Sequence, residues 1–137
     1  MNKTKVKPVD ELKLILDSLK SQGKKVVFTN GCFDLIHVGH IRYLRKAKIL
    51  GDILILALNS DRSVSLLKGP GRPLITQKDR AEILCAFSMI DFLIIFDEPN
   101  VEKLLLAIQP HVHAKGSDYT KESVPERKIV ESYGGEV

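Results

Sequence analysis

The sequence predicts an α/β fold of the Rossmann-like kind, a doubly wound parallel sheet with a helix at its N-terminal end. Short runs rich in β-branched and aromatic residues alternate with segments in which apolar residues recur at helical spacing. One of these runs, Ile53 to Leu58, is apolar throughout, which is typical of a strand covered on both faces in a parallel sheet. At 137 residues we expect one domain, residues 1–137, in which residues 1–24 form a helical lead-in.

The first half of the chain is predicted to contain two helices and two strands. Asp10 and Glu11 stand at the start of an amphipathic segment, where the helix dipole favours acidic side chains. Gly23 and Gly51 stand where the two helical segments end. The predicted elements are a helix over Pro8 to Leu19, a strand over Val26 to Thr29, a helix over Val38 to Leu50 and a strand over Ile53 to Leu58.

In the second half the alternation of strands and helices continues. A polar stretch rich in glycine and proline, Asn59 to Pro73, is predicted to be a loop. The elements expected after it are a helix over Gln77 to Ser88, a strand over Phe92 to Phe96, a helix over Val101 to Ile108, a strand over Val112 to Ala114 and a helix over Pro125 to Tyr133.

Composition and charge exclude several classes of protein. With 44% hydrophobic and 28% charged residues the chain has a globular composition, and no apolar run approaches the length of a membrane-spanning helix. The N-terminus does not resemble a signal peptide, and Cys32 and Cys85 lie far apart, so we expect a cytoplasmic protein with reduced thiols and no membrane partner. The net charge of +4 suits anionic ligands. Because no basic run is interleaved with aromatic residues, phosphorylated small molecules fit better than nucleic acid.

The segment Gly31 to His40 carries the clearest chemical signal. It follows the first predicted strand and opens a helix, so it lies at the carboxyl edge of the sheet, where such folds bind ligands. Backbone N–H groups there can receive phosphate oxygens, and Gly39 allows a close approach. His37 and His40 are three residues apart, so both imidazoles can face one ligand. Two such donors would stabilise the charge that develops during displacement at phosphorus.

Two other interpretations of the same segment remain open at this point. The two histidines can be capping and core residues without a chemical role. A zinc site is the second alternative, although the spacing matches none of the usual Cys/His pairs. Its ligands would be Cys32, Asp34, His37 and His40.

This segment is similar to the His-x-Gly-His signature of the nucleotidyltransferase superfamily, and its Gly-Cys-Phe-Asp opening resembles the cytidylyltransferase-like branch. Further segments resemble the D-glycero-β-D-manno-heptose 1-phosphate adenylyltransferase family. These are Asn59 to Asp61, Leu67 to Gly69, Gly71 to Pro73, Arg80, and Lys115 to Tyr119. The resemblance covers nearly the whole chain and implies the strand order 3-2-1-4-5, in which the first and fourth strands are neighbours.

The resemblance implies an adenylyltransferase that joins AMP from ATP to D-glycero-β-D-manno-heptose 1-phosphate, giving ADP-heptose and pyrophosphate by direct in-line transfer. The product would supply lipopolysaccharide inner core or another heptose-containing glycan. Mg²⁺ is expected with ATP, since it takes phosphate oxygens and waters with few protein ligands. The family also implies a homodimer. In many members the other half of the chain is a sugar kinase, whereas a chain that starts at Met1 resembles the free-standing form and implies a separate heptose kinase.

The resemblance assigns roles to individual residues. The catalytic group comprises His37, His40 and Lys68. The nucleotide-binding group comprises Asn30, Gly31, Cys32, Phe33, Gly39, His40, Lys115 and Gly116. The sugar-phosphate-binding group comprises Asp34, Asp61, Lys68, Arg72 and Arg80, and no residue is assigned to a metal.

Several of these residues have a structural alternative. The alternatives are a turn-stabilising carboxylate at Asp34, a solvated loop at Lys68 and Arg72, a surface salt bridge at Arg80 and a plain turn at Lys115 and Gly116. The resemblance does not mark His111 and His113, which we expect to be structural.

Two other functions remain open. A CTP-dependent cytidylyltransferase for glycerol 3-phosphate or a similar alcohol phosphate shares the histidine motif, although the Leu-Lys-Gly and Lys-Gly-Ser-Asp-Tyr segments argue against it. A non-catalytic nucleotide-binding module would use the same crevice only to sense ATP.

The end of the chain departs from the family pattern. Members of the family continue past the Gly-Gly-Glu-Val segment with another strand and a Ser/Thr-rich turn at a helix N-terminus, which helps to bind the phosphates. The sequence ends at Val137, so it does not include this C-terminal strand and helix. We expect either a longer protein that supplies them, which we favour, or a chain that lacks part of its triphosphate site.

Overall fold

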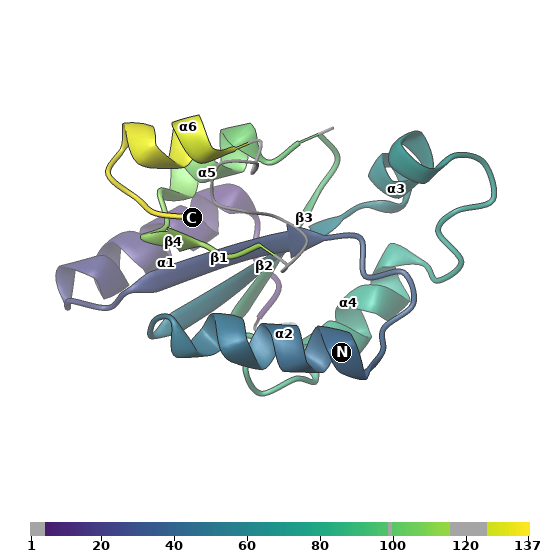
Figure 1. Ribbon diagram of the computed structural model, residues 1–137, viewed down its shortest axis with the longest axis horizontal. Helices are drawn as coiled ribbons and strands as arrows, with labels where there is room; N and C mark the ends of the chain where they lie inside the picture. Colours follow the sequence, from purple (N-terminus) through teal and green to yellow (C-terminus); the bar gives the residue numbers. More distant parts are fainter. Residues whose placement is uncertain (1–4, 99, 116–125) are drawn as a thin grey trace.

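A four-stranded parallel sheet lies at the centre of the computed structural model, with the strand order β3-β2-β1-β4 (Figure 1). The strands are β1 (Val26–Gly31), β2 (Ile53–Asn59), β3 (Phe92–Phe96) and β4 (Val112–His113). The structure describes residues 5–98, 100–115 and 126–137. The predicted order of the first four strands is confirmed. On the other side of β4, Glu136 forms an isolated parallel bridge with Val112, where a fifth strand is expected.

Helices cover both faces of the sheet. They are α1 (Val9–Ser21), α2 (Val38–Ile49), α3 (Asp61–Lys68), α4 (Gln77–Cys85), α5 (Glu102–Ile108) and α6 (Arg127–Ser132). Helices α2 and α4 pack on one face, and α1, α5 and α6 pack on the other, which confirms the doubly wound fold (Figure 1). Among the described residues, no helix has the length and apolar character needed to cross a membrane.

Apolar residues of the central strands point alternately to the two layers of helices. In β2, Leu54, Leu56 and Leu58 pack with α2 and α4. Ile55 and Ala57 pack with α1 and α5 on the opposite face. All five side chains are fully buried, so both faces of this strand need apolar residues. The continuous apolar run in the sequence has this physical cause.

The stretch Asn59 to Pro73 contains helix α3, so the expectation that it is a loop was wrong. Ser60 caps this helix, because its hydroxyl accepts a hydrogen bond from the Ser63 amide at 3.1 Å. Val64 is fully buried, whereas Leu66 and Leu67 are exposed. The helix has only eight residues and is followed at once by the glycine- and proline-rich residues 69–73, so the stretch as a whole has the composition of a loop, which explains the error.

Helix α4 is shorter than predicted and ends at Cys85 instead of Ser88. The amides of Ala86 and Phe87 donate to the carbonyls of Ile83 and Leu84, which forms a tight terminal turn. The other predicted elements agree with the structure to within two residues at each end.

The parallel sheet brings the carboxyl ends of its strands to one edge. Gly31, Asn59, Phe96 and His113 end the four strands at this edge. The loops that follow β1 and β2 therefore meet there, although α2 and β2 separate them in the sequence. A ligand site is expected at this edge.

Candidate nucleotide-binding site

A pocket of about 680 Å³ opens at the carboxyl edge of the sheet. Its walls come from strand ends, from the turn between β1 and α2, from α2 itself, and from the end of α3 with the segment after it. The lining residues are Asn30, Gly31, Cys32, Phe33, Asp34, Leu35, His40, Tyr43, Asn59, Leu67, Lys68, Arg72, Phe96, Asn100, Lys115 and Glu126. Most of the residues that the resemblance assigned to a site thus lie around one cavity.

The turn after β1 depends on a close contact between Phe33 and Gly31. Phe33 has a φ of 47°, a left-handed conformation that is uncommon for a large side chain. Its ring then lies so close to Gly31 that a Cβ on Gly31 would stand 2.7 Å from the Phe33 ring. The ring also packs on His40, with 5.1 Å between the ring centroids. Glycine at position 31 therefore allows the turn that carries the candidate phosphate-binding amides.

His37 and His40 form a reciprocal cap at the start of α2. The Gly39 amide donates to His37 Nδ1 at 3.0 Å, and the His37 amide donates to His40 Nδ1 at 3.2 Å. Because both Nδ1 atoms are acceptors, the proton of each neutral ring is on Nε2. A Cβ at Gly39 would stand 2.7 Å from the His37 ring, so the cap requires glycine there. The cap thus leaves two Nε2–H groups as donors at a helix N-terminus.

The two imidazoles pack closely, with 4.1 Å between the ring centroids. Burial lowers the pKa of His40, and the nearby charges of His37 and Lys68 lower it further. His40 lines the pocket, whereas His37 is exposed and is not among the lining residues. The two histidines therefore do cap the helix, as one interpretation of the sequence held. The hydrogen bonds to their Nδ1 atoms also fix the orientation of their Nε2–H donors.

Asp34 is buried and accepts hydrogen bonds from the segment between α3 and α4. Its carboxylate accepts from the amides of Leu74 at 2.8 Å and Ile75 at 3.0 Å, and from Arg72 Nε at 2.6 Å. Burial alone would raise the pKa of this carboxyl, but the amides of Ile75 and Leu74 and the Arg72 guanidinium outweigh it and lower the pKa to about 2. Asp34 thus holds Arg72 at the pocket, as a turn-stabilising carboxylate does.

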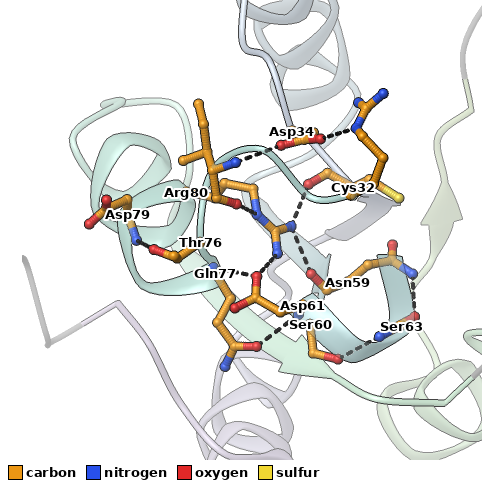
Figure 2. Close-up of polar contacts among 12 residues, drawn as sticks. Cys32, Asp34, Asn59, Ser60, Asp61, Ser63, Thr76, Gln77, Asp79 and Arg80 are labelled. Carbon is orange, nitrogen blue, oxygen red and sulfur yellow. Dashed lines mark hydrogen bonds and ion pairs between the residues drawn. The ribbon is translucent and has the colours of Figure 1, made fainter. Parts of the chain in front are cut away.

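Arg80 has no exposed surface, so the alternative of a surface salt bridge was wrong. Figure 2 shows its guanidinium between three segments of the chain. Nη1 donates to the carbonyls of Cys32 at 2.6 Å and Asn59 at 2.8 Å. Nε donates to Ile75 O at 2.9 Å, and Nη2 donates to Asp61 Oδ1 at 2.9 Å. With its donors used in this way and no place in the pocket lining, Arg80 is not arranged as a phosphate fork.

The Arg80 bond to Cys32 also sets the direction of one backbone amide. In a trans peptide the carbonyl and the N–H point in opposite directions. Arg80 holds the Cys32 carbonyl, so the Phe33 N–H of the same peptide points away from Arg80. Within the described residues this N–H donates to no backbone acceptor. Arg80 therefore keeps one donor of the turn available for a ligand.

Asp61 is tied to the same network and does not line the pocket. Its Oδ1 accepts from Gln77 N at 2.7 Å, and Gln77 Oε1 accepts from Asp61 N at 2.9 Å. These two bonds join the first turns of α3 and α4 (Figure 2). The predicted sugar-phosphate group is thus divided: Asp34, Lys68 and Arg72 lie at the pocket, whereas Asp61 and Arg80 hold its walls together.

Several lining residues were not predicted from the sequence. Asn59 and Phe96 end strands, so the rule that ligands bind at the carboxyl edge would have indicated them. Tyr43 reaches the pocket from α2 and donates to Ala114 O at 2.8 Å, which no motif indicates. Glu126 also lines the pocket, with its Oε2 3.9 Å from Lys115 Nζ. Gly116, which the resemblance assigned to the nucleotide, lies outside the described residues.

The zinc alternative has no support in the described part of the chain. No group of three metal-ligating side chains is close enough there to hold an ion. Asp34 is used by Arg72 and two amides, and Cys32 is a free thiol whose pKa is raised by burial. Both cysteines are free.

The parallel sheet and the capped turn at its edge form the architecture of a nucleotide-binding α/β protein. Residues 28–136 match the cytidylyltransferase-like family, and the chain belongs to this family. The predicted branch of the superfamily is therefore confirmed.

The chain is also similar to individual proteins of known name. The bifunctional protein HldE of Pelobacter propionicus is 53% identical over 134 residues, which are 98% of this chain and 28% of that relative. The bifunctional protein HldE of Geobacter metallireducens is 54% identical over 97% of this chain and 27% of the relative. The chain thus spans little more than a quarter of the length of these curated relatives. A crystal structure described as the lipopolysaccharide core biosynthesis protein from Thermoplasma volcanium GSS1 is 25% identical, with a TM-score of 0.68 over 83% of this chain and 92% of that one.

Replacing Arg80 by methionine should lower the free energy of unfolding by about 2 to 3 kcal/mol, because buried carbonyls of Cys32 and Asn59 lose their donor. Urea unfolding measures this difference. Arg45→Met makes the same chemical change at an exposed position of α2 and should stay within about 0.5 kcal/mol of the wild type. Equal stabilities of the two variants would show that the Arg80 network does not hold the loops.

The Asp34 carboxylate should make stability depend on pH in the acid range. Its pKa in the folded protein is about 2, below the ordinary value of 3.8, so its contribution is present above about pH 4 and is lost as the pH falls towards 2. The wild type should lose about 2 kcal/mol relative to Asp34→Asn over this range. Urea unfolding at several pH values tests this. A constant difference would contradict the assignment, and Asp17→Asn on the exposed face of α1 is the control.

Proposed function

We propose that this chain is an adenylyltransferase that joins AMP from ATP to D-glycero-β-D-manno-heptose 1-phosphate and releases pyrophosphate. The observation that carries the proposal is the capped pair of imidazoles at the start of α2, in which both Nε2–H groups remain as donors. The heptose is supported by the sequence resemblance and by relatives named bifunctional protein HldE. The description of the similar crystal structure as a lipopolysaccharide core biosynthesis protein agrees with it.

The proposed reaction is a single displacement at phosphorus. A phosphate oxygen of the sugar 1-phosphate forms a bond to the α-phosphorus of ATP. The bond between that phosphorus and the oxygen that bridges to the β-phosphate breaks, and pyrophosphate leaves with the electron pair. The Nε2–H groups of His37 and His40, with the Phe33 amide, would stabilise the negative charge on the α-phosphate oxygens. No histidine acts as a nucleophile or a general base in this scheme.

Three cationic side chains are suited to the phosphates. Lys68 lines the pocket from the end of α3, Arg72 from the segment that follows this helix, and Lys115 from the segment that follows β4. We assign Lys68 and Arg72 to the sugar phosphate, with Lys68 also at the transferred group, and Lys115 to the nucleotide. Asp34 acts in this proposal by orienting Arg72, and Asp61 and Arg80 act by positioning the walls of the pocket.

Mg²⁺ is proposed to enter with ATP. The two carboxylates of the pocket, Asp34 and Glu126, are each paired with a cationic side chain. The ion would therefore be held mainly by phosphate oxygens and water, as Mg²⁺ commonly is. Its chemical contribution would be to neutralise charge on the triphosphate. A cytoplasmic homodimer that acts after a heptose kinase completes the proposal, and the word bifunctional in the names of the relatives supports a second activity in the longer chains.

Release of pyrophosphate separates this function from its alternatives. Purified protein is incubated with ATP or CTP and with heptose 1-phosphate or glycerol 3-phosphate. Release only with ATP and heptose 1-phosphate is expected. Release with CTP and glycerol 3-phosphate would favour a cytidylyltransferase, and ATP binding without any release would favour a non-catalytic module.

His37→Ala and His40→Ala should each lower kcat by about 100-fold to 1000-fold, because each variant removes a donor that acts on charge in the transition state. Circular dichroism should show an intact fold, since loss of an N-cap contact costs about 1 kcal/mol. Arg45→Ala on the exposed face of α2 serves as the control. A variant that keeps more than about a tenth of the wild-type rate would refute the catalytic assignment of that histidine.

ATP should bind more tightly than CTP by about tenfold or more, which corresponds to about 1.4 kcal/mol. Calorimetric titration of the wild type with each nucleotide and Mg²⁺ measures the two Kd values. Tighter binding of CTP would contradict the adenylyltransferase and support the cytidylyltransferase.

A further inference from the structure

His113 is a buried histidine beside the pocket that the proposed chemistry does not use. It ends β4 with no exposed surface, and its ring meets the edge of Phe28 with 5.5 Å between centroids. Its Nε2 lies 3.0 Å from Oδ1 of Asn30, near the end of the neighbouring strand β1. Asn30 lines the pocket, whereas His113 does not. The pair therefore connects a buried ring to the cavity through one side chain.

The proton of the His113 ring is placed by this contact. An amide oxygen only accepts hydrogen bonds, so Nε2 carries the proton and donates it to Asn30. Nδ1 is then an acceptor, and it is buried without a hydrogen-bond partner among the described residues. Burial, with a smaller effect of Lys115, lowers the pKa of His113 to about 3, so the ring stays neutral near pH 7. His113 is thus a permanent single donor to Asn30.

The donor from His113 has a consequence for Asn30. A free amide side chain can turn over and present either its oxygen or its NH₂ group to a ligand. Here the oxygen is held by Nε2, and Nδ2 makes no hydrogen bond to a described residue. Asn30 is only partly buried, at the rim of the cavity. The NH₂ group is therefore the part of this amide left for a ligand.

We propose that His113 is a positioning residue that fixes the Asn30 amide, so that Asn30 donates a hydrogen bond to an acceptor atom of the bound nucleotide. The inference rests on the proposed function, because it takes the ligand of this pocket to be a nucleotide. His113 would thus affect nucleotide binding although it does not line the pocket. An oxygen or an unprotonated ring nitrogen of the ligand would be accepted at Asn30, and a donor group would be disfavoured.

Calorimetric titration with Mg²⁺ and ATP tests this inference on four proteins: wild type, Asn30→Ala, His113→Leu and the double variant. His113→Leu should raise the Kd by about 3-fold to 10-fold, the usual effect of losing one hydrogen bond. Because His113 acts only through Asn30, the double variant should bind as Asn30→Ala does. His113→Gln, which can donate from its terminal amide, should bind within about twofold of the wild type.

Two further measurements distinguish positioning from a structural role. His113→Leu should keep or raise the melting temperature, because it removes the buried Nδ1 that has no partner among the described residues, while Asn30 Oδ1 lies at the rim of the cavity, where water can replace the lost donor. Nitrogen-15 NMR of the histidine rings should show the proton of His113 on Nε2.

Four results would overturn the inference: wild-type affinity in His113→Leu, additive losses in the double variant, a proton on Nδ1, or no ATP binding by the wild type. A wild type that binds ATP but releases no pyrophosphate with heptose 1-phosphate would refute the proposed function alone. The comparison of Kd values would still decide the role of His113.

Discussion

The guanidinium of Arg80 joins three segments that meet at the carboxyl edge of the sheet. Through the carbonyls of Cys32, Asn59 and Ile75 it holds together the turn after β1, the end of β2 and the segment that precedes α4. A fully buried arginine is stable only when its donors are satisfied, so these segments cannot shift independently of one another. The shape of the pocket therefore depends on this side chain, although Arg80 does not line it.

Backbone hydrogen bonds in the turn after β1 have the same effect on a smaller scale. The amides of His37 and Gly39 donate to ring nitrogens, so two imidazoles are oriented by the first turn of the helix that they cap. The Arg80 bond to Cys32 directs the next amide, that of Phe33, away from the protein network. Structural bonds on one side of each group thus leave a donor on the other side. Such preorganised donors need no rearrangement when charge develops on a ligand.

Prediction from the sequence succeeded where the signal is local. The run Ile53 to Leu58 indicated a strand buried on both faces, and that strand is β2 at the centre of the sheet. The segment Gly31 to His40 indicated a turn at the start of a helix, and the structure has that turn. Prediction failed for α3, because this eight-residue helix lies in a polar stretch rich in glycine and proline, whose composition indicates a loop. It did not indicate the buried network of Arg80, which the resemblance placed among the sugar-phosphate ligands, because the carbonyls that accept its hydrogen bonds come from segments far apart in the sequence.

The sequence by itself determined the order of strands and helices, the doubly wound class and the turn that carries the two histidines, because periodicity, glycine positions and capping residues act over a few neighbours. Only the tertiary structure decided which side chains share the pocket and which support it. Asp61 and Arg80 are 19 residues apart, and His113 and Asn30 are 83 apart, so no local pattern records either pair. Whether a polar side chain faces a ligand or another part of the chain depends on the partners that folding brings within hydrogen-bond distance, and those come from segments far away in the sequence.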